Sequence, residues 1–224
     1  MTIERAEVVG VLLAGGQSRR MFNRGARDAT APAETGDKGL LDLGGKTMLG
    51  HVIERLAPQV GRMVINANGD PSRFDRFELP VVADTVGGFA GPLAGVLAAM
   101  RWTAAEAPAA KFIVTVSTDA PFLPRDLVAQ LIAAEATEPG GIALAASGGE
   151  LHPVIGLWPV ARADDLEASL NQGMRKVLAW TDRHGTIPVD FPFQRIGAAC
   201  IDPFFNANTP EELAQARDLL AAGT

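Results

Sequence analysis

The stretch with the clearest chemical potential lies near the start of the chain, where an apolar run ends in glycines and arginines. Residues 8–13 read VVGVLL, and Gly15, Gly16, Arg19 and Arg20 follow them. Glycines let a backbone approach a ligand closely, and exposed N–H groups with guanidinium side chains hold phosphate oxygens. A strand followed by an ordinary turn is the alternative interpretation, because short glycine motifs often occur by chance.

Polar side chains with suitable chemistry also follow later apolar runs. Asn66 and Asp84 each end such a run, and Asp119 follows the most apolar one, residues 112–116. Because the carboxyl ends of parallel strands meet at one edge of a sheet, we expect these side chains to gather there. Together with Lys38 they suit a polyphosphate with Mg²⁺, which takes one or two carboxylates plus substrate phosphates. Taken singly, either aspartate could instead be a turn or cap residue.

Other catalytic classes lack their motifs in this sequence. It contains no GxxxxGK[ST], GxGxxG, GxSxG or HExxH pattern, which argues against P-loop, dinucleotide-binding, serine hydrolase and zinc protease chemistry. Among the three histidines, His152 is the best functional candidate, since it precedes Pro153 in an expected loop at a sheet end. The single cysteine, Cys200, excludes a disulfide framework, and its apolar neighbours predict a packed core thiol.

The composition bounds the fold and the partners. With 224 residues, of which 47% are hydrophobic and 21% charged, the chain is expected to form a single domain over residues 1–224. A net charge of −6 argues against binding nucleic acid over a broad surface. Residues 8–13 are too short to span a membrane and follow acidic residues, so we predict neither a membrane segment nor a signal peptide. The expected compartment is the cytoplasm.

Apolar runs alternate with helical patterns along the chain. Strands are expected at residues 8–13, 62–68, 80–84, 112–116, 142–146, 154–158 and 186–190. Helices are expected at residues 48–58, 93–105, from 124 onward, 161–170, 175–184 and from 210 onward. This alternation predicts an α/β fold with a doubly wound, mostly parallel sheet and helices on both faces. Residues 22–37 lack periodicity and predict a mobile loop insertion, either a lid or a solvated segment.

Several segments together resemble the molybdenum cofactor guanylyltransferase family. The resemblance begins with residues 13–21, LAGGQSRRM, and extends over almost the whole chain. Its further segments are residues 37–41, 66–68, 84, 91–95, 119–121, 152–153 and 206–213. One departure follows the first segment, where Phe22 stands after Met21 and the Asp37-Lys38 pair comes only after the long insertion.

Membership in that family implies a Rossmann-like fold of the nucleotide-diphospho-sugar transferase type. It also implies an enzyme that uses Mg²⁺ to transfer GMP from GTP to the terminal phosphate of Mo-molybdopterin, giving molybdopterin guanine dinucleotide and pyrophosphate. By resemblance, the nucleotide-binding positions are Leu13, Ala14, Gly15, Gly16, Lys38, Asn66, Asp84 and Asp119. Asp119 matches the metal ligand. The catalytic positions implied by the resemblance are Arg20, Lys38 and Asp119. His152, Asn206 and Asn208 are the candidates for the pterin side.

Two alternatives stay open at the level of the sequence. The pair Gly15-Gly16 resembles guanylyl enzymes, whereas a molybdopterin cytidylyltransferase or a sugar-1-phosphate nucleotidyltransferase on the same fold more often has Ala-Ala-Gly. A non-catalytic nucleotide-binding or cofactor-delivery module is the other alternative, although the presence of both Asp119 and Lys38 argues against it. Insertion or delivery proteins for the molybdenum cofactor are potential partners.

Overall fold

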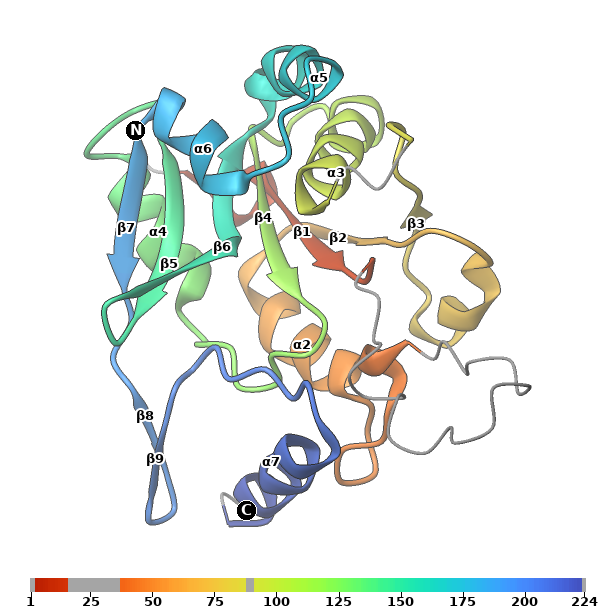
Figure 1. Cartoon of the computed structure of the whole chain (residues 1–224), viewed down its shortest axis with the longest axis vertical. Coiled ribbons are helices and arrows are strands. Elements are labelled where there is room, and N and C mark those ends of the chain that lie inside the picture. The colour runs from red at the N-terminus through yellow and green to blue at the C-terminus, as the bar shows by residue number, and fades with distance from the viewer. Residues whose placement is uncertain (1–2, 16–36, 88–90, 223–224) are drawn as a thin grey trace.

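The computed structural model describes residues 3–15, 37–87 and 91–222, and its centre is a sheet (Figure 1). In these ranges the sheet has seven strands in the order β3-β2-β1-β4-β6-β5-β7. Their bounds are β1 Val8–Leu13, β2 Arg62–Asn66, β3 Val81–Val82, β4 Phe112–Ser117, β5 Ile142–Ser147, β6 Glu150–Pro159 and β7 Thr186–Asp190. Strands β3, β2, β1 and β4 are parallel, and only β6 runs against its neighbours β4 and β5. The prediction of a mostly parallel sheet is confirmed.

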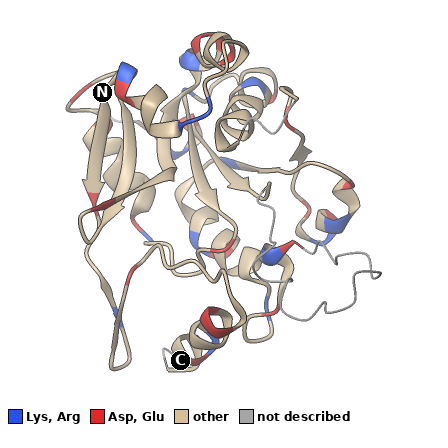
Figure 2. Cartoon of the chain, viewed as in Figure 1, with Lys and Arg blue, Asp and Glu red and all other residues tan. Residues whose placement is uncertain are grey.

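Helices cover both faces of this sheet, as expected. Their bounds are α2 Met48–Leu56, α3 Pro92–Glu106, α4 Leu127–Glu135, α5 Ala163–Asn171, α6 Val177–Thr181 and α7 Pro210–Ala222. Apolar residues of α2 and α4 belong to one core cluster, and those of α3 and α5 belong to a second. Charged residues lie mainly on helices, loops and strand ends (Figure 2).

Burial on both faces explains why β1 reads as a continuous apolar run. Val8 and Leu12 pack in the first core cluster, whereas Val9 and Val11 pack in the second. Successive side chains of a strand point to opposite faces, so a strand covered on both faces needs an apolar residue at every position. Within the described residues, no helix is long and apolar enough to cross a membrane.

The return from β5 to β6 differs from the expected loop. Gly148 and Gly149, with φ angles of 57° and 86°, form a tight turn between the strands. Two consecutive residues at positive φ are what a two-residue hairpin turn requires, and glycine adopts that conformation without strain. His152 therefore lies within β6 rather than in a loop. A second difference concerns helix α4, which the sequence predicts from residue 124 onward and which begins at Leu127, three residues later.

A small antiparallel ribbon before the last helix has no counterpart among the expected elements. It consists of β8 Gln194–Ile196 and β9 Ala199–Ile201, and its register sets Cys200 opposite Arg195. The prediction that Cys200 is a core thiol is wrong, because this residue is exposed. In a two-stranded ribbon that pairs with no other strand, alternate residues face solvent even when the local sequence is apolar.

Two predictions about the chain's organisation are not tested by this structure. That residues 1–224 form a single domain stays a prediction. Of the predicted loop at residues 22–37, only Asp37 belongs to the described residues.

Thr47 provides a test of the local signals that shape the fold. Its Oγ1 accepts a hydrogen bond of 3.0 Å from the backbone N–H of Gly50 at the start of α2. We expect Thr47→Ala to lower the free energy of unfolding by about 1 kcal/mol, the usual value of an N-cap side chain. Urea denaturation measures this, and Thr47→Ser, which keeps the hydroxyl, should retain most of the stability. Equal losses in both variants would contradict a capping role.

Candidate functional site

The ends of three parallel strands lie level at one edge of the sheet. The register sets Leu13 at the end of β1 opposite Asn66 of β2 on one side and Ser117 of β4 on the other. Pairing continues one residue further, where the Ala14 N–H donates to the Asn66 carbonyl at 2.9 Å. The chain segments that leave these strands therefore begin side by side, and they carry two separate groups of polar residues.

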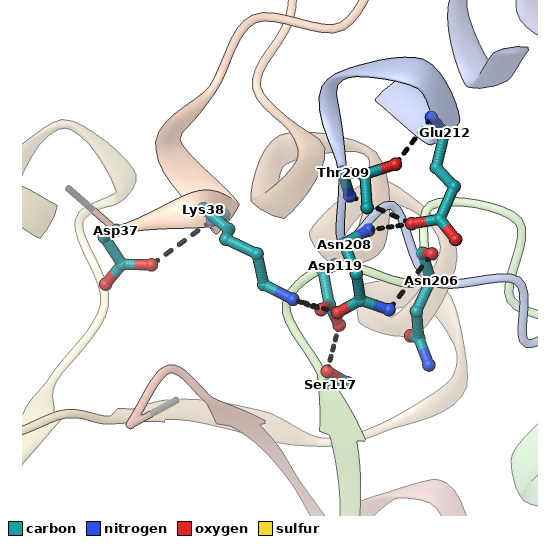
Figure 3. A network of polar contacts seen from close by, with 9 residues as sticks. Asp37, Lys38, Ser117, Asp119, Asn206, Asn208, Thr209 and Glu212 are labelled. Atoms are coloured by element: carbon teal, nitrogen blue, oxygen red, sulfur yellow. Dashed lines mark hydrogen bonds and ion pairs between the residues drawn. The ribbon is translucent and has the colours of Figure 1, made fainter. Parts of the chain in front are cut away.

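The first group, which we call the Lys38 group, joins three distant parts of the chain (Figure 3). The Lys38 ammonium forms an ion pair with Asp119 Oδ2 and donates to Asn208 Oδ1 at 2.6 Å. The Ser117 hydroxyl donates to Asp119 Oδ1. The side chains of Lys38 and Asp119 are only 16% and 8% exposed. The structure thus brings together a cation and an acid that the sequence separates by 81 positions.

Asp37 shapes the turn that carries Lys38. Its Oδ1 accepts from the Gly39 N–H at 3.2 Å, and the other oxygen lies 3.7 Å from Arg73 Nε. Burial raises the pKa of Asp37 above its ordinary value, and the Gly39 hydrogen bond and the Arg73 charge offset only part of that effect.

The cap of helix α7 holds Asn208 in place. The Glu212 carboxylate accepts from the N–H groups of Asn208 at 2.7 Å and Thr209 at 2.9 Å, and the Glu212 N–H donates to Thr209 Oγ1 at 3.2 Å. These bonds form a capping box at the start of α7, where the sequence predicts a helix. The Ala207 N–H donates to the Asp119 carbonyl at 3.2 Å. The cap of the last helix therefore also fixes the segment that meets Lys38 and Asp119.

The second group, which we call the Asp84 group, consists of two amide side chains around the Asp84 carboxylate. Asn66 Nδ2 donates to Asp84 Oδ1 at 2.9 Å, and Asn68 Nδ2 donates to Asp84 Oδ2 at 2.8 Å. The Asp84 N–H in turn donates to Asn68 Oδ1 at 2.9 Å. A Cβ at Gly95 of α3 would lie 2.2 Å from Asn66 Oδ1, so glycine is needed where this helix passes the group.

Sequence reasoning selected Asn66 and Asp84 but missed two residues that hold the carboxylates. Asn68 lies two residues after Asn66 in the same Asn-Ala-Asn segment, and that spacing was the available signal. Ser117 ends the apolar run before Asp119, and nothing in the sequence distinguishes it from a strand-end serine.

The pterin-side candidates do not form one group. Asn208 belongs to the Lys38 group, whereas His152 lies next to Ser147 and packs on the ring of Phe204, with 4.6 Å between centroids. The Asn206 carbonyl accepts from Asn208 Nδ2 at 3.3 Å. Asn206 Oδ1 is buried and has no hydrogen-bond partner among the described residues.

The glycine turn is only partly described. Leu13 ends β1, and Ala14 and the exposed Gly15 follow it. Gly16 and Arg20 lie outside the described residues.

Oxygen donors define what this edge could bind. Within the described ranges there is no cluster of three or more His, Cys, Asp or Glu residues that could hold a metal by themselves. Asp119 and Asn208 nevertheless place a carboxylate and an amide oxygen around one ammonium group. Mg²⁺ needs only one or two protein carboxylates when phosphate oxygens supply the remaining ligands, so the donor set fits this ion.

A doubly wound sheet with a largely buried lysine–aspartate pair beside the end of β4 is an arrangement suited to a phosphorylated ligand, because ligands of such sheets bind at the carboxyl ends of the strands. The chain matches the family model of the MobA-like NTP transferase domain over residues 10–187. It is 50% identical over 215 residues to a molybdenum cofactor guanylyltransferase of Bradyrhizobium sp. (strain ORS 278), covering 96% of this chain and 93% of the relative. The chain therefore belongs to the molybdenum cofactor guanylyltransferase family, and the resemblance found in the sequence is confirmed.

Further comparisons agree with this assignment. A molybdenum cofactor guanylyltransferase of Mesorhizobium japonicum is 46% identical over 221 residues, covering 98% of this chain and 99% of the relative. The crystal structure of molybdopterin-guanine dinucleotide biosynthesis protein A from Archaeoglobus fulgidus has a TM-score of 0.66 and 22% identity, covering 95% of this chain and 98% of that one. At 22% identity the Archaeoglobus fulgidus structure shows the fold alone, and it agrees with the predicted doubly wound, mostly parallel sheet.

The raised pKa of Asp37 predicts a pH-dependent stability. A buried carboxyl whose pKa is higher in the folded state binds its proton longer than in the unfolded chain, so stability falls as pH rises through the ordinary value of 3.8. We expect Asp37→Asn, which retains an oxygen for Gly39, to gain stability relative to the unaltered protein as pH rises from below to above this range. Urea denaturation across that pH interval measures the difference.

Asp70 is the matched control with the opposite sign. Hydrogen bonds from the Ser72 hydroxyl and N–H lower the pKa of this exposed carboxyl. Its contribution to stability is therefore lost as pH falls, and Asp70→Asn should lose relative stability as pH rises. The same direction of change in both variants would contradict the burial effect at Asp37.

Proposed function

We propose that this chain transfers the guanylyl group of GTP to the terminal phosphate of Mo-molybdopterin, giving molybdopterin guanine dinucleotide and pyrophosphate. The observation that carries this proposal is the meeting of Lys38 with Asp119 and Asn208 beside the end of β4. Relatives with about half of their residues identical carry the name of this activity.

The reaction requires positioning and charge neutralisation more than covalent chemistry. An oxygen of the acceptor phosphate attacks the α-phosphorus of GTP, and the bond from that phosphorus to the oxygen of the leaving pyrophosphate breaks. The acceptor phosphate is already an anion, so the step needs no strong base. Lys38 would offset negative charge on the β- and γ-phosphates, as would Arg20. Preorganised charges of this kind supply much of the rate of phosphoryl transfer.

The oxygens around Lys38 suit a magnesium ion. Asp119 would be its protein ligand, and Asn208 would be the nearest additional oxygen donor. When bound, Mg²⁺ would supply positive charge that stabilises the negative charge of the nucleotide phosphates. Ser117 would keep the Asp119 carboxylate oriented through its hydroxyl.

The Asp84 group would bind the guanine base. Asp84 offers two oxygens held by Asn66 and Asn68, and a carboxylate accepts hydrogen bonds from the adjacent N–H and NH₂ groups of guanine. The glycine turn, from Leu13 through Ala14 and Gly15 to Gly16, would lie along the nucleotide and contribute N–H donors to the phosphates.

Pyrophosphate release tests the whole proposal. Purified protein with Mg²⁺ and Mo-molybdopterin should release pyrophosphate from GTP and form the dinucleotide, and release should be much slower with CTP. A preference for CTP would make the protein a cytidylyltransferase. Tight GTP binding without pyrophosphate release in the presence of the acceptor would indicate a binding or delivery module.

Asp119 provides the first test of an individual residue. We expect Asp119→Asn to lower the rate of Mg²⁺-dependent transfer by about a hundredfold or more, since the variant loses the charge that would hold the ion. The matched control is Asp126→Asn, an exposed aspartate at the N-cap of α4 whose side chain makes no capping hydrogen bond and accepts from Gln130 Nε2 at 2.7 Å. Circular dichroism checks that both variants fold. Full activity of folded Asp119→Asn would refute the metal assignment.

Lys38 provides the second test of an individual residue. We expect Lys38→Ala to weaken GTP binding about tenfold or more, because a charge-assisted contact to phosphate is lost. Guanosine, which has no phosphate, should bind both proteins alike. Lys46→Ala is the control, because Lys46 is an exposed lysine that forms an ion pair with Glu54. Unchanged GTP affinity in a calorimetric titration would place Lys38 outside the phosphate site.

A further inference from the structure

Three side chains outside the Lys38 group form a hydrogen-bonded chain. Ser147 at the end of β5 lies with its hydroxyl 2.6 Å from His152 Nε2 in β6 and donates to Asp202 Oδ2 at 2.8 Å. Ser147 is only 3% exposed. Asp202 follows β9, and its other oxygen accepts from the Phe204 N–H at 2.8 Å. The proposed transfer assigns no task to Ser147 or Asp202.

The number of protons shared by Ser147, His152 and Asp202 determines which nitrogen of the imidazole carries a proton. A serine hydroxyl has one hydrogen, and here Asp202 accepts it. The short contact with His152 is then a hydrogen bond only if Nε2 carries a proton and donates to the serine oxygen. In a neutral imidazole this leaves Nδ1 as an acceptor.

We propose that Ser147 and Asp202 are positioning residues that hold His152 as the Nε2–H tautomer, so that Nδ1 accepts a hydrogen bond from an N–H group of the pterin ring of the acceptor. This inference rests on the proposed function, in which the acceptor carries a pterin ring with ring and exocyclic N–H groups, whereas the guanine of GTP, which has such groups too, is assigned to Asp84. Among the described residues Nδ1 has no hydrogen-bond partner, and it is not one of the buried polar atoms that lack one. It is therefore reachable from solvent.

The segment after β9 connects the three hydrogen-bonded residues Ser147, His152 and Asp202 to the Lys38 group. Asp202 and Phe204 contact Ser147 and His152, whereas Asn208 contacts Lys38. Asn208 lies six residues after Asp202, which limits their separation to about 20 Å even in an extended chain. This length is the upper limit of the span between the two groups that a substrate with a phosphate at one end and a ring at the other would bridge.

Asn206 adds an independent observation within that segment. Its Oδ1 is one of two buried side-chain polar atoms without a hydrogen-bond partner in the described residues. Buried acceptors in native proteins are nearly always satisfied. Asn206 lies between Asp202 and Asn208 in the sequence, so this acceptor belongs to the segment that connects the two groups.

The surroundings of His152 favour the neutral ring. Burial lowers the pKa of His152, and the nearby Asp202 and Glu150 carboxylates oppose this effect only in part. The ring is therefore neutral at neutral pH and retains the lone pair on Nδ1. In acid, Nδ1 gains a proton and can no longer accept, so the KM for the acceptor should rise as pH falls through the pKa of His152.

Asp202→Asn gives the sharpest test because it should reverse the tautomer. The new amide can still accept from the Phe204 N–H through its oxygen, but its NH₂ group donates to the Ser147 hydroxyl. That hydroxyl then donates to Nε2, and the imidazole proton moves to Nδ1. Nitrogen-15 correlation spectra of histidine-labelled protein should show the proton on Nε2 in the unaltered protein and on Nδ1 in Asp202→Asn.

The kinetic consequence should be confined to one substrate. We expect Asp202→Asn and Ser147→Ala to raise the KM for Mo-molybdopterin about tenfold, the usual effect of losing a buried hydrogen bond. The KM for GTP should stay unchanged. Glu150→Gln is the matched control, since it removes a carboxylate near His152 without touching the hydrogen-bonded chain. It should leave both the tautomer and the KM for the acceptor unchanged.

Several outcomes would overturn the inference. A proton on Nδ1 in the unaltered protein would refute the tautomer, and unchanged acceptor KM in folded Ser147→Ala would refute the contact with the pterin. Ser147→Ala decides the matter alone if Asp202→Asn does not fold. Failure of the proposed function is distinguishable, because the unaltered protein would then release no pyrophosphate with the acceptor while its tautomer could still be read.

Discussion

Lys38 reaches Asp119 at the sheet edge, and much of the structure around it serves to make this contact possible. Both side chains are largely buried, and taking two charges out of water costs free energy that the ion pair alone need not repay. Asn208 and Ser117 each add a hydrogen bond to one partner. The result is a pair of opposite charges held in fixed positions, which is the preorganisation that a reaction between anions requires.

Parallel register and one antiparallel strand bring the remaining groups to the same edge. Strands β3, β2, β1 and β4 run in the same direction and end at one edge, so the segments carrying Asp84 after β3 and Asp119 after β4 leave the sheet on the same side. Strand β6 runs in the opposite direction, so its beginning, rather than its end, lies at the edge where β4 ends. His152 near the beginning of β6 and Ser147 at the end of β5 therefore both lie at this edge.

The segment from Asp202 to Glu212 links the parts of the site to the last helix. Its residues bond in turn to Ser147, to the Asp119 backbone and to Lys38, and the cap of α7 ends it. A cap contributes only about 1 kcal/mol to stability, but here it also determines where Asn208 lies. A local helix signal thus has a consequence for the chemistry far from it in sequence.

The sequence by itself determined the strands of the central sheet, the helices and the chemical types at the strand ends, because these depend on hydrophobic periodicity and on local caps such as Thr47 and Thr209. Tertiary structure decided which of these residues meet. Lys38 pairs with Asp119 and Asn208, and Ser147 joins His152 to Asp202, across separations of up to 170 positions that no local pattern encodes. It also decided the exposure of Cys200, because an apolar sequence is buried only where another element covers it.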